Sequence, residues 1–356
     1  MKISDLETPA ALLDLDILKK NMDTIEQIIA PYPVKLRPHF KTCKSIQIAK
    51  MQLEAGAVGI TTSKLAEAQV LVDAGFPNVL IANQIIQKSK LKRLASLALK
   101  SHIIVCVDQA QNIYDLSEAA TKAGAEIFVY IEYDIGMHRC GVSTYEDFYA
   151  LAKLITELPS ITFSGIQAYA GHLSHEADLN LVQQKVLEYE ERLKGLKKYL
   201  EERGIPVKDI SGASTNTSRY KAGHGVYTEL QPGSYVFVDQ AYRPCHLPYE
   251  QSLFIVATVI SKSTDRIILD VGAKGLGMDQ VFPCVVGHEE DDYILSEEHF
   301  AVQNSKGIPY TEKIGDKVLL IPGHCCTTIN LYPELYVKKG EDITTVWNVE
   351  GSLKSV

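Results

Sequence analysis

Residues 102–133, HIIVCVDQAQNIYDLSEAATKAGAEIFVYIEY, predict a strand, a helix and a second strand. Both ends of this stretch are rich in β-branched and aromatic residues, while the middle has apolar residues at helical spacing and ends at Gly124. The same alternation extends outward over the first 240 residues. Eight strand-like runs span residues 34–40, 59–62, 78–82, 102–107, 126–133, 161–170, 209–213 and 229–237. Eight alternating units predict a parallel sheet closed as a (β/α)8 TIM barrel, although a doubly wound open sheet would give a similar pattern.

The pattern changes after Pro244. Short β-rich runs such as SLFIVATVISKS (252–263) and DKVLLIPG (316–323) follow one another, and no long helical pattern lies between them. This predicts a smaller antiparallel β domain over residues 245–356, after a barrel domain over residues 1–244. Residues 1–14 include the extended run ETPAALLD, which could join the β domain.

Composition excludes several classes of protein. The 356 residues are 46% hydrophobic and 22% charged, which excludes disordered, collagen-like and coiled-coil chains. The net charge of −8 gives no electrostatic support for nucleic-acid binding. No apolar run approaches the roughly 20 residues that span a bilayer, and the N-terminus lacks a secretory apolar run. The seven scattered cysteines fit a reduced compartment, so we expect a cytoplasmic protein without a membrane partner.

Lys41 is the first candidate for chemistry. It lies in RPHFKTCK (37–44), directly after the first predicted strand, where barrels carry their active sites. A lysine there can form a Schiff base if its pKa is low enough to expose a free amine, and the nearby Arg37, His39 and Lys44 would lower that pKa. The alternative is a solvated loop lysine.

Three further residues follow the fifth and sixth strands. Arg139 lies in IEYDIGMHRCGV (131–142), where it could bind an oxygen of a cofactor or form a surface ion pair. Tyr169 and His172 lie in GIQAYAGHLSH (165–175). The Tyr169 ring could stack on a flat cofactor. His172 could act as an acid or base or bind a metal, or it could be a packed, hydrogen-bonded residue.

Two loops have the composition of a phosphate site. SGASTNTS (211–218) follows the seventh strand and QPGSY (231–235) lies in the eighth, and both offer small residues, hydroxyls and backbone N–H groups. Loops at these positions commonly bind phosphate in barrels. Serine- and glycine-rich loops are frequent, so either loop alone is a weak signal.

The segment IPGHCCTTINLY (321–332) contains a possible metal site. His324 and Cys326 are two residues apart, and in an extended chain they would point the same way, with Cys325 packed on the other side. Imidazole and thiolate are a pair of donors that zinc prefers. Two protein ligands leave positions for a third residue, water or substrate. Alternatively, Cys326 is a buried apolar residue.

Together these segments resemble the D-threonine aldolase / D-serine dehydratase family of alanine-racemase-like, fold type III pyridoxal-phosphate enzymes. The resemblance covers essentially the whole chain. It rests on an ordered set of segments: ETPAALLDLD, RPHFKTCK, DIGMHRCGV, YAGH, LQPGSYVF, DVGAKGLGMD and PGHCCTTINLY. Each is unspecific alone, but their order is specific.

The resemblance implies a role for each candidate. Lys41 would carry pyridoxal 5'-phosphate, Tyr169 would lie against its ring and Arg139 would approach its phenolic oxygen. Gln231 falls where racemases place an arginine near the pyridine nitrogen, so the protonation of that nitrogen is less firmly decided. The phosphate-binding positions would be Ser214, Thr215, Gly233 and Ser234, and the metal ligands would be His324 and Cys326.

The predicted activity is a lyase reaction on D-3-hydroxy amino acids that requires pyridoxal phosphate and a divalent metal, Zn²⁺ or else Mn²⁺. The His-x-Cys spacing favours a D-serine/D-threonine dehydratase, with Lys41 taking the Cα proton. The close alternative is a D-threonine aldolase, with His172 as the base, and a hydroxyaspartate-type substrate is open. An amino-acid racemase is disfavoured because the second-base tyrosine has no counterpart. A pyridoxal-phosphate carrier resembles the barrel alone. The resemblance also implies a homodimer.

Overall fold

The computed structural model describes residues 1–304 and 309–355. Residues 305–308 and 356, which the predicted β domain includes, lie outside the described residues. The chain divides into two compact units. The first, here called the β unit, comprises Met1–Ile25, Thr42–Gln47 and Ser234–Leu353, and the second, called the barrel unit, consists mainly of Glu26–Lys41 and Ile48–Gly233.

The barrel unit contains an eight-stranded parallel sheet. Its strands are β2 (Lys35–Leu36), β3 (Ile60–Thr62), β4 (Asn78–Gln84), β5 (His102–Val107), β6 (Ile127–Glu132), β7 (Ile161–Ala168), β8 (Asp209–Gly212) and β9 (Glu229–Leu230). They are ordered β2-β9-β8-β7-β6-β5-β4-β3. An isolated parallel bridge between His39 and Thr61 joins the two ends of this order. The predicted barrel class is therefore confirmed.

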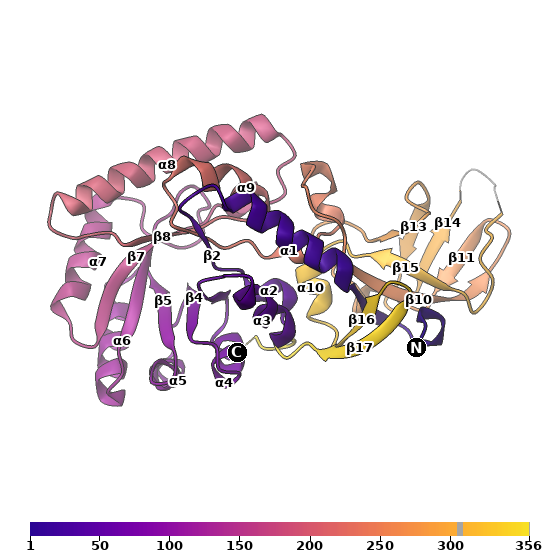
Figure 1. The fold of residues 1–356 in the computed structure, drawn as a ribbon, viewed down its shortest axis with the longest axis horizontal. Coiled ribbons are helices and arrows are strands. Elements are labelled where there is room, and N and C mark those ends of the chain that lie inside the picture. Colours follow the sequence, from indigo (N-terminus) through magenta and orange to yellow (C-terminus); the bar gives the residue numbers. More distant parts are fainter. Residues whose placement is uncertain (305–308, 356) are drawn as a thin grey trace. The chain divides into compact units, whose positions relative to one another are not determined.

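Helices alternate with these strands and lie along the outside of the sheet (Figure 1). They are α3 (Ile46–Glu54), α4 (Leu65–Asp73), α5 (Lys88–Ala98), α6 (Ala110–Ala123), α7 (Tyr145–Glu157), α8 (Leu179–Glu201) and α9 (Thr215–Lys221). The helix α6 ends at Gly124, whose φ of 66° suits the left-handed cap that glycine adopts at little strain. Inside the sheet Leu80, Ile104, Cys106 and Tyr130 pack together. Parallel order brings all strand ends of one kind to one rim, which gathers the candidate side chains.

The β unit is built on a nine-stranded, mostly antiparallel sheet. Its strands are β1 (Ala10–Asp14), β10 (Leu253–Lys262), β11 (Arg266–Leu269), β12 (Cys284–Val285), β13 (Asp292–Leu295), β14 (Phe300–Gln303), β15 (Lys317–Ile321), β16 (Glu334–Lys339) and β17 (Asp342–Asn348). The strand β1 pairs antiparallel with β10 and parallel with β16. Leu12 and Val256 belong to the apolar cluster of this sheet. The short helix α10 (Cys325–Ile329) follows β15. The helix α1 (Leu15–Ile29) connects the two units along the chain.

Three local predictions are wrong. The last barrel strand ends at Leu230, because Pro232 lacks an N–H for a ladder bond and Ser234–Val236 forms a 3-10 turn. The first barrel strand ends at Leu36, shortly before Pro38, and Lys41 lies in the one-turn helix α2 (Phe40–Cys43) rather than in a loop. Cys326 lies in the helix α10, so the extended-chain argument for His324 and Cys326 does not hold.

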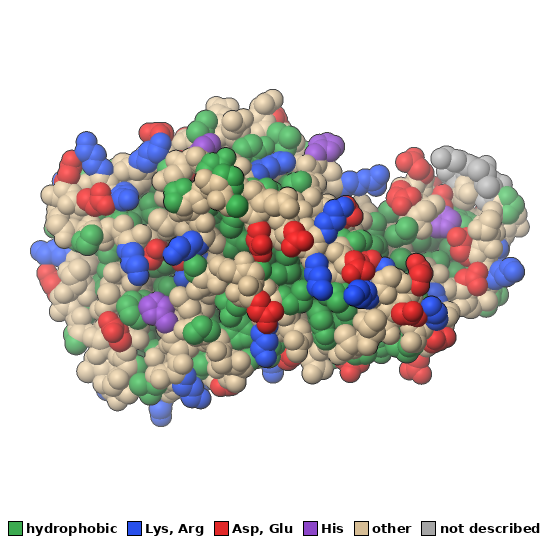
Figure 2. All heavy atoms as spheres, in the orientation of Figure 1, with side chains coloured by type: hydrophobic (Ala, Val, Ile, Leu, Met, Phe, Trp, Pro, Cys, Tyr) green, Lys and Arg blue, Asp and Glu red, His purple; other side chains and the backbone are tan. Residues whose placement is uncertain are grey.

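Basic and acidic side chains are interspersed on the face seen in Figure 2. Among the described residues, no helix combines the length and the apolar character needed to cross a membrane.

Candidate functional site

Lys41, Tyr169 and Arg139 come together at the rim of the barrel. The Lys41 amine lies 5.6 Å from the centroid of the Tyr169 ring. The Arg139 guanidinium lies 5.7 Å from the same centroid. An aromatic ring with two cationic groups beside it suits a flat cofactor that carries a phosphate. The residues present therefore fit pyridoxal phosphate, and the Lys41 amine is a group that could form a Schiff base with its aldehyde.

The cations expected to crowd Lys41 are engaged elsewhere. Arg37 is buried and forms an ion pair with Glu229, with 2.6 Å between Arg37 Nη2 and Glu229 Oε1. Lys44 donates a hydrogen bond of 3.1 Å to the Gly351 carbonyl. The Glu229 carboxylate thus compensates the Arg37 charge. The expected lowering of the pKa of Lys41 by its cationic neighbours stays a prediction. His39 stays close, since the Lys41 backbone N–H donates to His39 Nδ1 at 3.3 Å.

Arg139 is positioned by an acidic residue that the sequence argument missed. Its Nη2 lies 3.5 Å from Oε1 of Glu132, the last residue of β6. The other oxygen of Glu132 accepts a hydrogen bond of 2.6 Å from the Gln84 amide. Burial raises the pKa of Glu132 despite these partners. Arg139 thus forms the ion pair that was the alternative interpretation, with Glu132 as its partner. The Arg139 guanidinium also lies beside the Tyr169 ring.

His172 lies in a short 3-10 turn, Gly171–Leu173, and its ring is held by a tyrosine. His172 Nε2 and the Tyr189 hydroxyl are 3.0 Å apart. Burial lowers the pKa of His172 and thereby favours the neutral imidazole, which can accept a proton. Gly171 is required here, because a Cβ would collide with the Tyr169 ring and with Met137.

The Gln231 amide is buried in a network of neutral groups. It donates to Gln167 Oε1 and to Ser211 Oγ, both at 2.8 Å. In the loop after β8, the Ser214 hydroxyl accepts a hydrogen bond of 3.3 Å from the Thr217 backbone N–H. Ser214 and Thr215 are both buried. Gln231, Ser214 and Thr215 are therefore held on the barrel unit, as is Gly233, while Ser234 begins the next segment of the β unit.

His324 and Cys326 interact with each other in the β unit. Burial alone would lower the pKa of His324, but the hydrogen bond and charge of Cys326, with help from Asp279, outweigh burial and raise the pKa to about 9. The Cys326 sulfur lies 3.2 Å from the Thr42 hydroxyl and 3.9 Å from that of Ser234. Cys325 is fully buried, as expected. A nitrogen and a sulfur donor that face each other fit a zinc-like ion.

These two donors are a pair rather than a complete set of ligands. Within residues 1–304 and 309–355, no three His, Cys, Asp or Glu side chains are arranged to hold a metal ion. Asp279 contacts His324 but was missed as a functional residue. It ends the quoted segment DVGAKGLGMD, and its position in the sequence carries no signal that it reaches His324.

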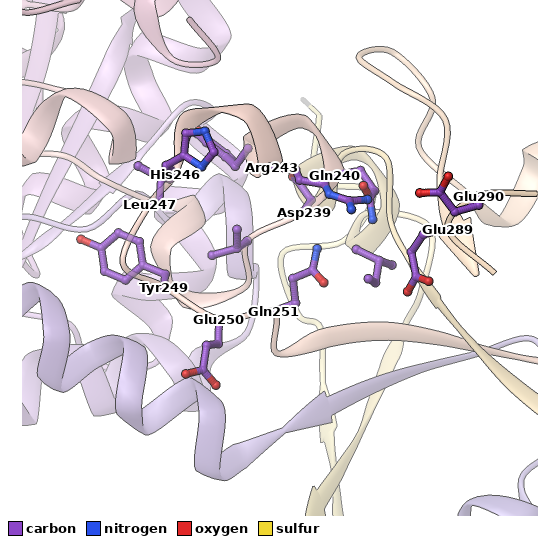
Figure 3. Close-up of a pocket in the computed structure, with 13 residues that line it drawn as sticks. Asp239, Gln240, Arg243, His246, Leu247, Tyr249, Glu250, Gln251, Glu289 and Glu290 are labelled. Carbon is purple, nitrogen blue, oxygen red and sulfur yellow. The ribbon is translucent and has the colours of Figure 1, made fainter. Parts of the chain in front are cut away.

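A cavity of about 630 Å³ lies beside this turn within the β unit (Figure 3). Its lining includes Arg243, His246, Glu250 and Glu289. Asp239 also lines it, and the Asp239 carboxylate accepts a hydrogen bond of 2.7 Å from the Cys325 backbone N–H. Burial raises the pKa of Asp239 to about 6. Asp239 thus anchors the backbone between the two donors.

Comparison with known proteins identifies the family. The profile of the alanine racemase N-terminal domain matches residues 13–241, well over half of the chain. The chain belongs to the alanine racemase N-terminal domain family. In this family member a serine dehydratase domain profile matches residues 252–338 as well.

The relatives are lyases. A 3-hydroxy-D-aspartate aldolase of Paracoccus denitrificans is 34% identical, over 98% of this chain and 93% of its own length. A D-threonine aldolase of an Arthrobacter species is 35% identical, with the same coverage of both chains. The crystal structure of a D-threonine aldolase from Filomicrobium marinum superposes with a TM-score of 0.95 at 33% identity, covering 99% of this chain and 97% of the other. These findings confirm the predicted family, fold class and enzyme class.

Proposed function

We propose that this protein is a pyridoxal-phosphate- and metal-dependent lyase that cleaves D-3-hydroxy amino acids of the D-threonine type between Cα and Cβ. The main support for pyridoxal-phosphate binding is that the Lys41 amine lies 5.6 Å from the centroid of the Tyr169 ring, which the Arg139 guanidinium also approaches. Support for carbon–carbon cleavage comes from the two relatives at 34% and 35% identity, both of which are named aldolases.

In this proposal Lys41 binds the cofactor, Tyr169 lies against its ring and Arg139 approaches its phenolic oxygen. Ser214, Thr215, Gly233 and Ser234 hold its phosphate. Pyridoxal phosphate supplies an electron sink adjacent to Cα. Gln231, a neutral amide fixed by Gln167 and Ser211, would be the residue near the pyridine nitrogen and would add no charge there.

His324 and Cys326 are the proposed metal ligands, and Zn²⁺ or Mn²⁺ would supply a Lewis acid for the 3-hydroxyl. His172 takes the proton of that hydroxyl as the Cα–Cβ bond breaks and the aldehyde is released. Cα then takes up one proton, so the second product is glycine. The neutral form that burial favours suits His172 to this step. Tyr189 keeps the imidazole oriented through its hydroxyl.

Dehydration is the second candidate, because His-x-Cys and the serine dehydratase profile over residues 252–338 favour it. There Lys41 takes the Cα proton and the 3-hydroxyl leaves as water. Hydrolysis of the resulting enamine by water then gives a 2-oxo acid and ammonia. The two reactions use the same residues and differ in the bond that breaks.

The test is a product assay on purified protein with pyridoxal phosphate and either Mn²⁺ or Zn²⁺. D-threonine, D-serine and 3-hydroxy-D-aspartate are supplied separately, with and without EDTA. Glycine plus acetaldehyde from D-threonine, lost with EDTA, is the expected result. 2-Oxobutyrate plus ammonia would establish the dehydratase instead, and turnover unaffected by EDTA would remove the metal from the proposal.

The proposal includes a homodimer, as the family resemblance implies. Light scattering on the cofactor-loaded protein should give twice the mass of one chain. A single-chain mass in the active protein would contradict it.

A further inference from the structure

Two segments of the β unit pack unusually closely around His324. Gly277 donates its backbone N–H to the Thr328 hydroxyl at 2.9 Å. A Cβ on Gly277 would collide with Thr327, and a Cβ on Gly323 would collide with the Val281 carbonyl. The residues 277–281 are therefore pressed against the turn that carries the two donors, with no space for a side chain at either glycine.

Asp279 projects from this segment onto the turn. One oxygen of its carboxylate lies 2.7 Å from His324 Nδ1. The other accepts a hydrogen bond of 2.6 Å from the Thr327 hydroxyl. An ionised carboxylate can only accept hydrogen bonds, so Nδ1 must carry the proton in this contact. When the imidazole is neutral, as a metal ligand must be, its lone pair is then on Nε2, and the ring cannot rotate without losing the contact with Asp279.

The arrangement has the chemistry of a carboxylate–histidine–metal triad, in which the outer carboxylate fixes the tautomer and orientation of the ligand. The two nitrogens of an imidazole point in different directions, so a carboxylate on Nδ1 does not share the ion on Nε2. Thr42 has a comparable position on the other donor, 3.2 Å from Cys326 Sγ.

We propose that Asp279 is a positioning residue that presents His324 Nε2 to the divalent ion. The inference rests on the proposed function, because it presumes that His324 is a metal ligand. Asp279 acts through His324 and touches neither substrate nor the reacting atoms.

The test is isothermal titration of Zn²⁺ into the full-length, pyridoxal-phosphate-loaded protein and into four variants. Asp279→Ala should raise the dissociation constant for Zn²⁺ by about 10- to 100-fold, the usual loss of affinity when an outer carboxylate is removed. The dissociation constant of Asp279→Asn should lie between those of Asp279→Ala and the parent. Asp292→Ala is the matched control, since Asp292 is an exposed carboxylate on β13 of the same unit. His324→Ala should abolish binding.

A second measurement reads orientation directly. NMR of the zinc-loaded protein with ¹⁵N-labelled histidine should show His324 protonated at Nδ1 in the parent and a mixture of tautomers in Asp279→Asn. Zinc binding by Asp279→Ala within twofold of the parent, with none by His324→Ala, would overturn the inference and leave the proposed function intact. A parent that binds no zinc would overturn both. If Asp279→Ala does not fold, Asp279→Asn decides by the same two measurements.

Discussion

Lys41 and His172 are the two side chains of the barrel unit that take up a proton in the proposed reactions, Lys41 in the dehydration and His172 in the cleavage. They differ in how the fold prepares them. The Lys41 amine and the Arg139 guanidinium lie 5.6 Å and 5.7 Å from the centroid of the Tyr169 ring, so Lys41 has a second cation close to its aromatic neighbour. His172 is kept neutral by burial and oriented by Tyr189. The proposed covalent anchor and the proposed proton acceptor are thus separate residues, one in the short helix α2 and one in the 3-10 turn after β7.

Replacing Lys41 with alanine should prevent covalent attachment of the cofactor. Without the amine no Schiff base forms, and pyridoxal phosphate should separate from Lys41→Ala on gel filtration while it stays with the parent. The visible absorbance of the filtered protein is the measurement. Lys50→Ala removes an exposed lysine of α3 and should retain the absorbance. A coloured Lys41→Ala protein after filtration would contradict the anchor.

Replacing His172 with glutamine should slow turnover of D-threonine by 10²- to 10⁴-fold, the usual contribution of a general base. Binding of the cofactor should be unchanged, because Lys41 remains. Steady-state rates of acetaldehyde formation are the measurement. His138→Gln is the control, since the side chain of His138 is 86% exposed and its ion pair is with Asp134 on the same loop. A His172→Gln enzyme as fast as the parent would assign the base to another residue.

At the scale of elements, periodicity predicts the middle of the barrel well and its ends poorly. The run 102–107 is the observed β5, because six consecutive buried or half-buried residues give a clear signal. The run 229–237 shrinks to two residues, because Pro232 and the 3-10 turn at Ser234–Val236 interrupt an otherwise β-rich segment. The α10 helix has five residues, fewer than periodicity can resolve, and its start is held by the Thr328 hydroxyl on the His324 carbonyl at 2.8 Å.

The candidate site shows the same limit. Lys41, Tyr169 and Arg139 could be grouped from the sequence because parallel strands bring their loops to one rim. Asp279, Glu132 and Tyr189 could not, because each acts through a contact between segments that neither spacing nor composition encodes. Residues such as these, which position another side chain, are not identified by a sequence motif of their own.

The buried contacts between α8 and α9 should make the stability of the protein depend on pH. Lys221 on α9 is fully buried, and burial lowers its pKa to about 7 from 10.5. Lys221 donates a hydrogen bond to the hydroxyl of Tyr227 and faces the carboxylate of Glu190 on α8. Burial raises the pKa values of both Tyr227 and Glu190. Glu190 also pairs with His224. Between pH 7 and 10.5 the unfolded chain binds a proton at Lys221 that the folded chain has lost, so this residue makes the free energy of unfolding rise with pH.

Lys221→Met should therefore flatten the pH dependence of stability. From pH 7.5 to 9.5 the parent should gain on the order of 2 kcal/mol relative to the variant, since a full proton difference contributes about 1.36 kcal/mol per pH unit. Urea denaturation of the cofactor-free protein at both values is the measurement. Lys198→Met, at a largely exposed position of α8, should follow the parent. Parallel curves for Lys221→Met and the parent would show that Lys221 is charged at both pH values.

At the scale of the whole molecule, the two proposed ligands belong to different units. Lys41 and Tyr169 are in the barrel unit, and His324 and Cys326 are in the β unit. Lys41 and Thr42 are consecutive residues that fall on either side of the division between the two units. The proposed lyase reaction uses both ligands, and the proposed binding residues of the two ligands are separate.

Each ligand should therefore stabilise the protein without the other. A ligand that binds only the folded chain adds about 2.7 kcal/mol at a concentration 100 times its dissociation constant, so pyridoxal phosphate and Zn²⁺ should each raise the thermal midpoint. In Lys41→Ala the shift with pyridoxal phosphate should shrink while the shift with Zn²⁺ remains. In His324→Ala the pattern should reverse. Differential scanning calorimetry of the three proteins, each with neither, one or both ligands, measures these shifts. A Zn²⁺ shift that disappears in Lys41→Ala would mean that the cofactor completes the metal site, and the two ligands would then have to be treated as one binding unit.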